Sequence, residues 1–218
     1  MDVTDIQIHT YMTLNDMPFI TNTVVITWGI ALLLFILSIL TTRRMKAVPG
    51  TLQLFMELII EGIHWLVDKT MGSDKRNFAP YMLALSLYML LANLTGLVVV
   101  RQPTADLNTT FALAAITFVM VHFNGFRMKK LRYIKGFFEP LPFMFPLNII
   151  SEIALPISLS FRLFGNMLGS LIIMFMLYHF APPLAPIIGH AYFDVFAGVI
   201  QTFIFVMLTM TFVSLAME

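Results

Sequence analysis

The sequence lacks cysteine and has few charged residues. None of its 218 residues is cysteine, which excludes disulfides, thiolate metal sites and cysteine nucleophiles. Charged residues make up 11% of the chain, whereas a soluble domain has about a quarter. The first sixteen residues, MDVTDIQIHTYMTLND, contain no Lys or Arg, so they do not have the basic start of a cleaved signal peptide.

Phosphate-binding and metal-binding patterns are also missing. The chain has no glycine-rich phosphate loop, and its five histidines form no i, i+4 pair. We therefore expect no metal, no cofactor, no nucleic-acid partner and no ATP hydrolysis by this chain itself.

Long apolar runs dominate what is present, because 59% of the residues are hydrophobic. A membrane-spanning helix needs about 20 apolar residues, and the chain has several runs of that length. We predict an all-α polytopic protein that forms a single membrane domain over residues 1–218. Its five membrane-embedded helices are expected at residues 19–40, 78–100, 104–126, 147–180 and 192–217, and the last two form a long tilted hairpin.

A sixth helix is expected at residues 50–70. Its apolar side chains recur on one side, with Glu57, Glu61 and Asp68 on the other. This pattern favours an amphipathic helix that lies on the membrane surface. The alternative is a short span with two buried acids.

The basic residues predict the orientation of the chain. Eleven of the 13 fall into two connecting regions that five crossings place on the same side of the membrane: Arg43, Arg44, Lys46, Lys69, Lys75, Arg76, Arg127, Lys129, Lys130, Arg132 and Lys135. Basic loops stay in the cytoplasm, so the N-terminus is expected outside and the C-terminus inside. Arg101 then lies in an outer loop, and Arg162 is left within the membrane.

Arg162 is the most unusual residue of the chain. At 1.5 Å per residue, a helix over 147–180 is about 51 Å long, and Arg162 lies about 22 Å and 27 Å from its ends. This is too far for the guanidinium to reach either surface, and a charge inside a bilayer usually marks a functional site. A structural ion pair with Glu152 or Asp194 is the alternative.

Polar residues continue from Arg162 along the same helix face. Ser158, Arg162, Asn166 and Ser170 follow one another at i, i+4 spacing. In the last helix, a second polar stripe contains Asp194, Gly198 and Gln201, and Thr209 extends it. If the two helices are antiparallel and these stripes face each other, they suggest a route for ions or protons.

The sequence resembles subunit a of F-type ATP synthases over nearly its whole length. The segments that carry the resemblance are PGTLQLFMELI (50–60), ANLTGL (92–97), PTADLNTT (103–110), PLNIISE (146–152), RLFGN (162–166) and QTFIFVMLT (201–209). They occur in the order of the family and near its spacing. RLFGN in such a topology is highly specific.

The resemblance implies that ions pass through two half-channels to and from a carboxylate on a rotating ring of c-subunits. Arg162 would match the essential arginine of the family, which favours the ionised carboxylate and blocks a leak between the channels. Gln201 would match the glutamine that faces this arginine, and Asn166 the asparagine one turn further on. Glu152 resembles an acid near either the inlet or the outlet. The c-ring, the peripheral b subunits and membrane lipid are the implied partners, in a bacterial-type cell membrane.

The sequence departs from the family pattern at two positions. Leu155 precedes Pro156 where members often have a basic residue, and Leu171 stands where many have Glu or His. The long helix therefore has no acid on the outer side of the arginine. We assign the inlet carboxylate to Asp194, with His190 one turn earlier as a relay partner near neutral pH. The alternative is that Asp194 caps the start of the last helix.

Two other functions make different demands on the sequence. A secondary transporter would use Arg162 to bind an anionic substrate and would show inverted repeats, which the sequence lacks. A purely structural membrane anchor would not need Arg162, Gln201 and Asp194 within the bilayer. The sequence does not distinguish H⁺ from Na⁺ as the transported ion, because the rotor helix would carry the binding groups.

Overall fold

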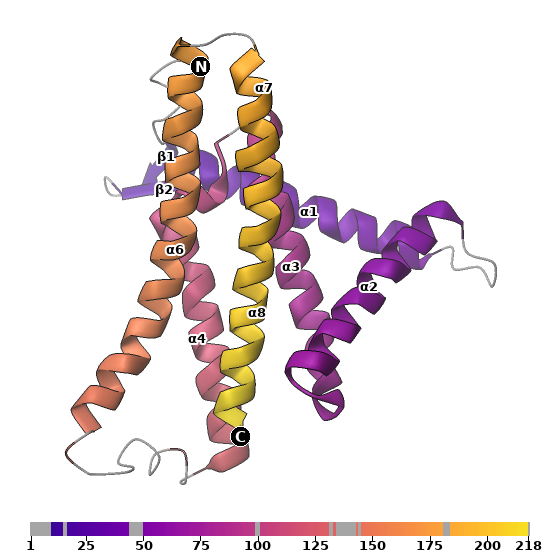
Figure 1. Ribbon diagram of the computed structural model, residues 1–218, viewed down its shortest axis with the longest axis vertical. Coiled ribbons are helices and arrows are strands. Elements are labelled where there is room, and N and C mark those ends of the chain that lie inside the picture. The colour runs from indigo at the N-terminus through magenta and orange to yellow at the C-terminus, as the bar shows by residue number, and fades with distance from the viewer. Residues whose placement is uncertain are drawn as a thin grey trace.

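The computed structural model describes residues 10–14, 17–43, 50–98, 101–130, 133, 143, 145–180 and 184–217. Long helices make up most of this part of the chain (Figure 1). They are α1 Asn22–Thr42, α2 Thr51–Thr70, α3 Ala79–Leu94, α4 Leu107–Lys129, α6 Phe145–Phe180, α7 Leu184–His190 and α8 Gly198–Met217. A π-helical segment, Ala191–Ala197, joins α7 to α8 without a break.

Five helical stretches within the described residues are long and apolar enough to cross a membrane. They are Asn22–Thr42, Ser73–Val98, Leu107–Lys129, Phe145–Phe180 and Ala185–Met217. The amphipathic helix α2 is not among them. The predicted fold class, an all-α polytopic membrane protein, is confirmed.

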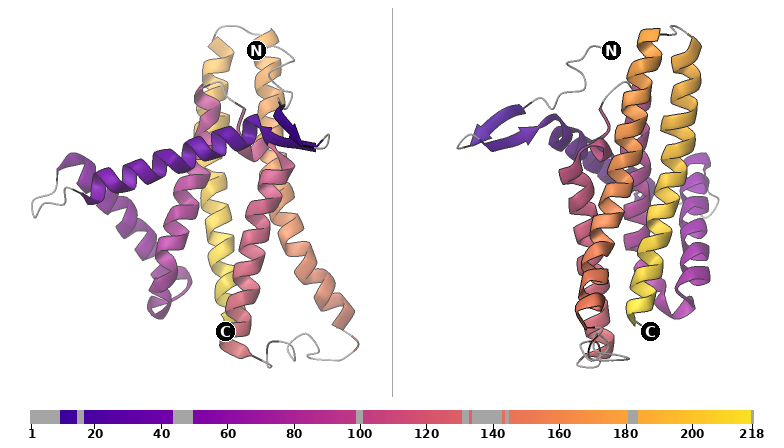
Figure 2. Two further views of the ribbon diagram at one scale, coloured as in Figure 1. Left: turned by 180° about the vertical axis from the view of Figure 1, so that it is seen from behind. Right: turned by 60° about the vertical axis from the view of Figure 1, so that its left-hand side comes forward.

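The helices α3, α4, α6 and α8 form a bundle. The right-hand view of Figure 2 shows α6 beside α4, with α6 running antiparallel to both α4 and α8. Large apolar side chains fill the space between them and are excluded from solvent, among them Met82, Met89, Leu163, Phe205 and Met210. Inside a bilayer, the close packing of these side chains against one another holds the helices together, because lipid is as apolar as the interior of the bundle. This packing fixes the directions of the helices that carry the polar residues.

The helix α1 crosses the bundle instead of running alongside it (Figure 2). Two of its residues, Thr23 and Ile30, are buried, so little apolar packing fixes its direction. Polar contacts add to this packing. The Thr23 hydroxyl donates to Asp106 Oδ2 at 3.3 Å, and the hydroxyls of Thr27 and Tyr88 lie 3.4 Å apart.

The N-terminal end of the described chain differs from the prediction. Strands β1 Thr10–Leu14 and β2 Met17–Thr21 form an antiparallel hairpin, and α1 begins after it, at Asn22. The first span was expected to begin at residue 19, within β2. The segment TYMTL is rich in β-branched and aromatic residues, which favour strands.

The last helix begins earlier than residue 192, where the sequence analysis placed its start. Helix α7 starts at Leu184 and includes Pro186 in its first turn. A proline is tolerated there because the first backbone N–H groups of a helix have no intrahelical acceptor. Asp194 consequently lies in the middle of a continuous helical stretch and does not cap a helix start.

The helix α6 contains Pro156 in its first half, and Figure 1 shows the helix changing direction in that half. A proline inside a helix removes one backbone hydrogen bond and commonly produces such a bend. Helices α6 and α7 lie side by side at their upper ends (Figure 1). The residues between them, 181–183, lie outside the described part of the chain.

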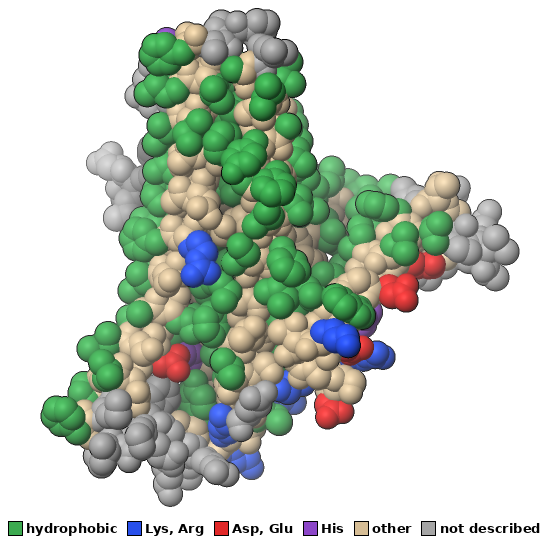
Figure 3. All heavy atoms as spheres, in the orientation of Figure 1, with side chains coloured by type: hydrophobic (Ala, Val, Ile, Leu, Met, Phe, Trp, Pro, Cys, Tyr) green, Lys and Arg blue, Asp and Glu red, His purple; other side chains and the backbone are tan. Residues whose placement is uncertain are grey.

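Charged side chains gather toward one end of the face shown in Figure 3, around α2 and the lower end of α8. At this end, hydrogen bonds from Arg76 hold the pKa of Asp68 below its ordinary value.

The turn after α2 depends on Gly72, whose φ of 93° favours glycine. Four of the basic residues used to predict the orientation, Arg44, Lys46, Arg132 and Lys135, lie outside the described residues.

The orientation can be tested with single cysteines, because the chain has none of its own. Lys130 follows α4 and Ile187 lies in α7, and both are exposed. We expect a membrane-impermeant maleimide to label Lys130→Cys from the cytoplasm and Ile187→Cys from outside. Detergent-solubilised samples, in which both should react, provide the control. Labelling of both from the same side would mean that α6 does not cross the membrane.

Candidate functional site

Arg162 lies on an exposed face of α6 and is the one Lys or Arg of that helix. Figure 3 shows a lone blue side chain part-way along α6, surrounded by apolar and uncharged groups. The guanidinium makes no hydrogen bond or ion pair with any residue that the structure describes. Ser158 and Gly165 are also exposed on α6. A permanent charge is thus presented on the outside of the bundle.

The two acids considered as partners of Arg162 are paired with histidines. Glu152 Oε2 lies 3.8 Å from His122 Nε2 of α4, and Asp194 Oδ2 contacts His190 Nδ1. Two effects raise the pKa of Tyr133, which follows α4 in the chain. Burial is the larger effect, and the nearby charge of Glu152 is the second. The structural ion pair weighed for Arg162 is therefore not formed.

Asn166 and Gln201 connect α6 to α8 one turn beyond Arg162. Asn166 Nδ2 donates to Gln201 Oε1 at 2.6 Å. Gln201 is buried, and its Nε2 has no acceptor among the described residues. The structure thus brings together Asn166 and Gln201, as the sequence analysis expected of facing stripes, but the glutamine does not bond to Arg162.

Asp194 lies within the π-helical segment and its side chain is buried, with 3% of the residue exposed. A π-helical turn holds more residues than an α-helical turn, so it changes which face of the following helix a side chain occupies. Such turns occur frequently at functional sites. A carboxylate in this position requires hydrogen-bond donors to offset its desolvation.

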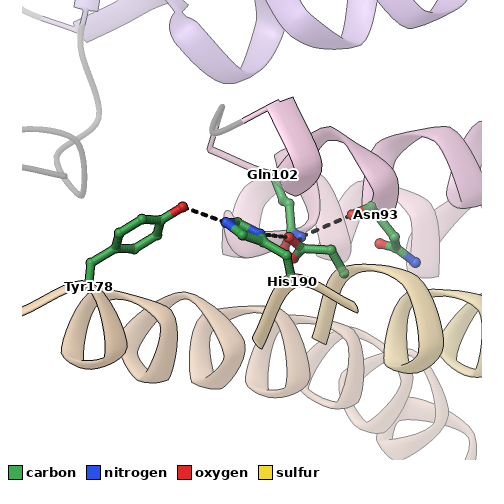
Figure 4. A network of polar contacts seen from close by, with 5 residues as sticks. Asn93, Gln102, Tyr178 and His190 are labelled. Carbon is green, nitrogen blue, oxygen red and sulfur yellow. Dashed lines mark hydrogen bonds and ion pairs between the residues drawn. The ribbon is translucent and has the colours of Figure 1, made fainter. Parts of the chain in front are cut away.

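Donors to Asp194 come from two sides. His190 Nδ1 contacts Oδ2, and Gln102 Nε2 lies 2.8 Å from Oδ1. The same Gln102 nitrogen donates to the backbone oxygen of Asn93 at 3.0 Å. Figure 4 shows Gln102 reaching from the α3–α4 connection toward the histidine, with Asn93 beyond it.

The network continues in both directions from Asp194. Tyr178 Oη on α6 lies 2.6 Å from His190 Nε2, which places three groups capable of proton exchange in a row. On the other side, Asn93 Nδ2 donates to Gly198 O and Thr202 Oγ1 of α8, both at 3.1 Å. Polar groups from α3, α6, α7 and α8 therefore meet around Asp194.

The sequence suggested that the polar stripe of α8 faces the stripe of α6. In the structure, only part of the α8 stripe does so. Gly198 and Thr202 face Asn93 of α3, and the hydroxyl of Thr209 lies 3.5 Å from that of Thr117 of α4. The reason is that α8 also packs against α3 and α4, which provide partners for Thr202 and Thr209, whereas Gln201 bonds to Asn166 of α6.

Four residues with polar contacts at the candidate site were not identified from the sequence: Asn93, Gln102 and Tyr178 of the network around Asp194, and His122, the partner of Glu152. Two lie in or beside quoted segments, since Asn93 belongs to ANLTGL and Gln102 directly precedes PTADLNTT. Their position in or beside segments that resemble the family was the signal that could have identified them. Tyr178 and His122 are separated from their partners by 12 and 30 residues, and no spacing pattern indicates such contacts.

The fold and the site define a multi-pass membrane protein with a charged arginine on its outer face and a buried carboxylate network inside. Residues 24–214 match the family described as "ATP synthase A chain". The chain belongs to this family.

Its curated relatives carry the name ATP synthase subunit a. The protein of Trichlorobacter lovleyi is 36% identical over 202 residues, which cover 90% of this chain and 87% of the relative. The protein of Geotalea daltonii is 40% identical over an alignment that covers 88% of this chain and 86% of the relative. A third relative, "ATP synthase subunit a, sodium ion specific" of Propionigenium modestum, is 36% identical. The alignment covers 89% of this chain and 73% of the relative.

Proposed function

We propose that this chain is the stator subunit of an F-type ATP synthase and provides two ion half-channels beside a rotating ring of c-subunits. The observation that carries the proposal is Arg162, whose guanidinium has no partner among the described residues and lies on an exposed face of a long apolar helix in a chain of this family. Such a charge needs an anionic partner from outside the described chain, and a carboxylate on the ring supplies one.

The inlet half-channel runs from outside through Tyr178, His190 and Asp194. Their donor and acceptor atoms are in hydrogen-bonding range, so a proton can pass from one group to the next. Asp194 lies seven residues before Gln201, about 10 Å along the helix at 1.5 Å per residue. The ion then loads the ring carboxylate near Asn166 and Gln201.

Arg162 separates the two half-channels. Its positive charge favours the ionised form of the approaching carboxylate, so the ion is released, and it repels cations that would leak directly between the channels. Ser158 lies one turn away on the same face. Glu152, with His122, lines one of the two channels near the other end of α6.

The proposal includes the surroundings of the chain. The N-terminus lies outside and the C-terminus in the cytoplasm of a bacterial-type cell membrane. The partners are the c-ring, the b subunits of the peripheral stalk and membrane lipid, and α2 lies at the membrane surface. The transported ion is H⁺ or Na⁺, and the binding groups of the ring decide which.

Copurification tests this function. We expect the affinity-tagged chain, extracted in mild detergent, to bring with it a ring of small glycine-rich helical hairpins and a soluble ATPase head. Mass spectrometry identifies both. A chain that purifies alone and carries a small anionic solute into proteoliposomes would instead be a secondary transporter.

A further inference from the structure

We propose that Gln102 is a positioning residue for the inlet: its side-chain amide fixes the carboxylate of Asp194 in the orientation that contacts His190. The inference rests on the proposed function, in which Asp194 carries the entering ion. It adds a residue from the α3–α4 connection to a path otherwise formed by α6, α7 and the π-helical segment.

The neighbours of Gln102 fix the orientation of its side-chain amide. Gln102 Nε2 faces two groups that accept hydrogen bonds, Asp194 Oδ1 at 2.8 Å and Asn93 O at 3.0 Å. An exchange of the amide oxygen and nitrogen would place three acceptors against one another. The donor assignment therefore follows from the neighbours, and Gln102 offers a hydrogen bond to the carboxylate.

Gln102 and Asp194 are both buried. Gln102 is 4% exposed and Asp194 3%, so water does not replace the bond between them. A hydrogen bond to a buried charged group is worth more than one between neutral groups. With Oδ1 held by Gln102, Oδ2 is directed to His190 Nδ1, and His190 Nε2 remains directed to Tyr178.

Gly96 leaves the space in which Gln102 and Asp194 meet. A Cβ atom at this position would lie 2.4 Å from Gln102 Nε2 and 2.5 Å from Asp194 Oδ1. A side chain there would push the amide and the carboxylate apart. The contact thus depends on a glycine at 96 as well as on a glutamine at 102.

A merely structural role for Gln102 makes a different prediction. The bond to Asn93 O ties the α3–α4 connection to α3, and its loss would weaken the fold whatever residue stands at position 194. A positioning role acts through the carboxylate. The two are distinguished by a double-mutant cycle with Asp194, since residues that act through one another have non-additive effects.

The experiment uses the intact ATP synthase in proteoliposomes. We expect Gln102→Leu to lower ion-driven ATP synthesis about tenfold, at the lower end of what a hydrogen bond to a charged group contributes. In an Asp194→Asn background the same change should cause no further loss. Gly96→Ala, which keeps the glutamine but displaces it, should show the same pattern and serves if Gln102→Leu does not assemble. Gln53→Leu, the same substitution in α2, is the matched control and should leave synthesis unchanged.

The outcomes separate this inference from the proposed function. Normal synthesis by both Gln102→Leu and Gly96→Ala, with Asp194→Asn impaired, would overturn the positioning role alone. Losses that multiply in the double variants would assign Gln102 to the fold. Near-normal synthesis by Asp194→Asn would overturn the inlet role of Asp194 and, with it, this inference.

Discussion

Arg162→Ala should abolish both ATP synthesis and ATP-driven ion pumping while the complex still assembles. The guanidinium is exposed on α6 and contributes no bond to the described fold, so its removal should cost little stability. Without its charge, the ring carboxylate keeps its ion and the barrier between the half-channels is lost. ATP synthesis and pumping in proteoliposomes, together with subunit content after purification, measure the two effects.

Two further variants sharpen this test. Arg162→Lys should also fail, because a compact ammonium does not replace a planar, permanently charged guanidinium. Arg127→Ala is the matched control, since Arg127 is an exposed arginine near the end of α4. It should leave both activities unchanged. Normal ATP-driven pumping by Arg162→Ala would refute the proposed role of the arginine.

Asp194→Asn should reduce ion-driven ATP synthesis by about 10²-fold, the lower end of the usual contribution of a positioned proton-transfer group. Asparagine has the shape of aspartate, and its amide oxygen still accepts a hydrogen bond from Gln102. It does not take up an ion as a carboxylate does. The substitution therefore removes the chemistry of the side chain and preserves most of its packing.

The measurement is synthesis driven by an imposed ion gradient across pH 6 to 8, with assembly followed in parallel. Asp74→Asn is the control, because Asp74 is an exposed acid outside the network, and we expect no effect of this change. Near-normal synthesis by Asp194→Asn over the whole range would show that the buried carboxylate serves packing only.

The fold class was predictable because apolar length is a local property. Runs such as Asn22–Thr42 and Phe145–Phe180 are apolar over more than the thickness of a bilayer, and each is a helix in the structure. The special character of Arg162 was also evident in the sequence, because its distance from both ends of α6 follows from the helical rise alone.

The site network around Asp194 was predictable only in part. The contact between His190 and Asp194 joins residues i and i+4 of one helix, a spacing that brings side chains together. Gln102 and Tyr178 lie 92 and 12 residues from their partners, so their contacts depend on how separate helices pack.

The sequence by itself determined the apolar helices, the isolated arginine and the pair of His190 and Asp194, since each depends on neighbours within one segment. The tertiary structure alone decided that α7 joins α8 through a π-helical turn, that Asp194 lies inside this helix, and that Gln102 reaches it across the space left by Gly96. The physical reason is that buried polar groups find their partners across helix interfaces. The directions of those interfaces are set by the packing of apolar side chains along the whole bundle.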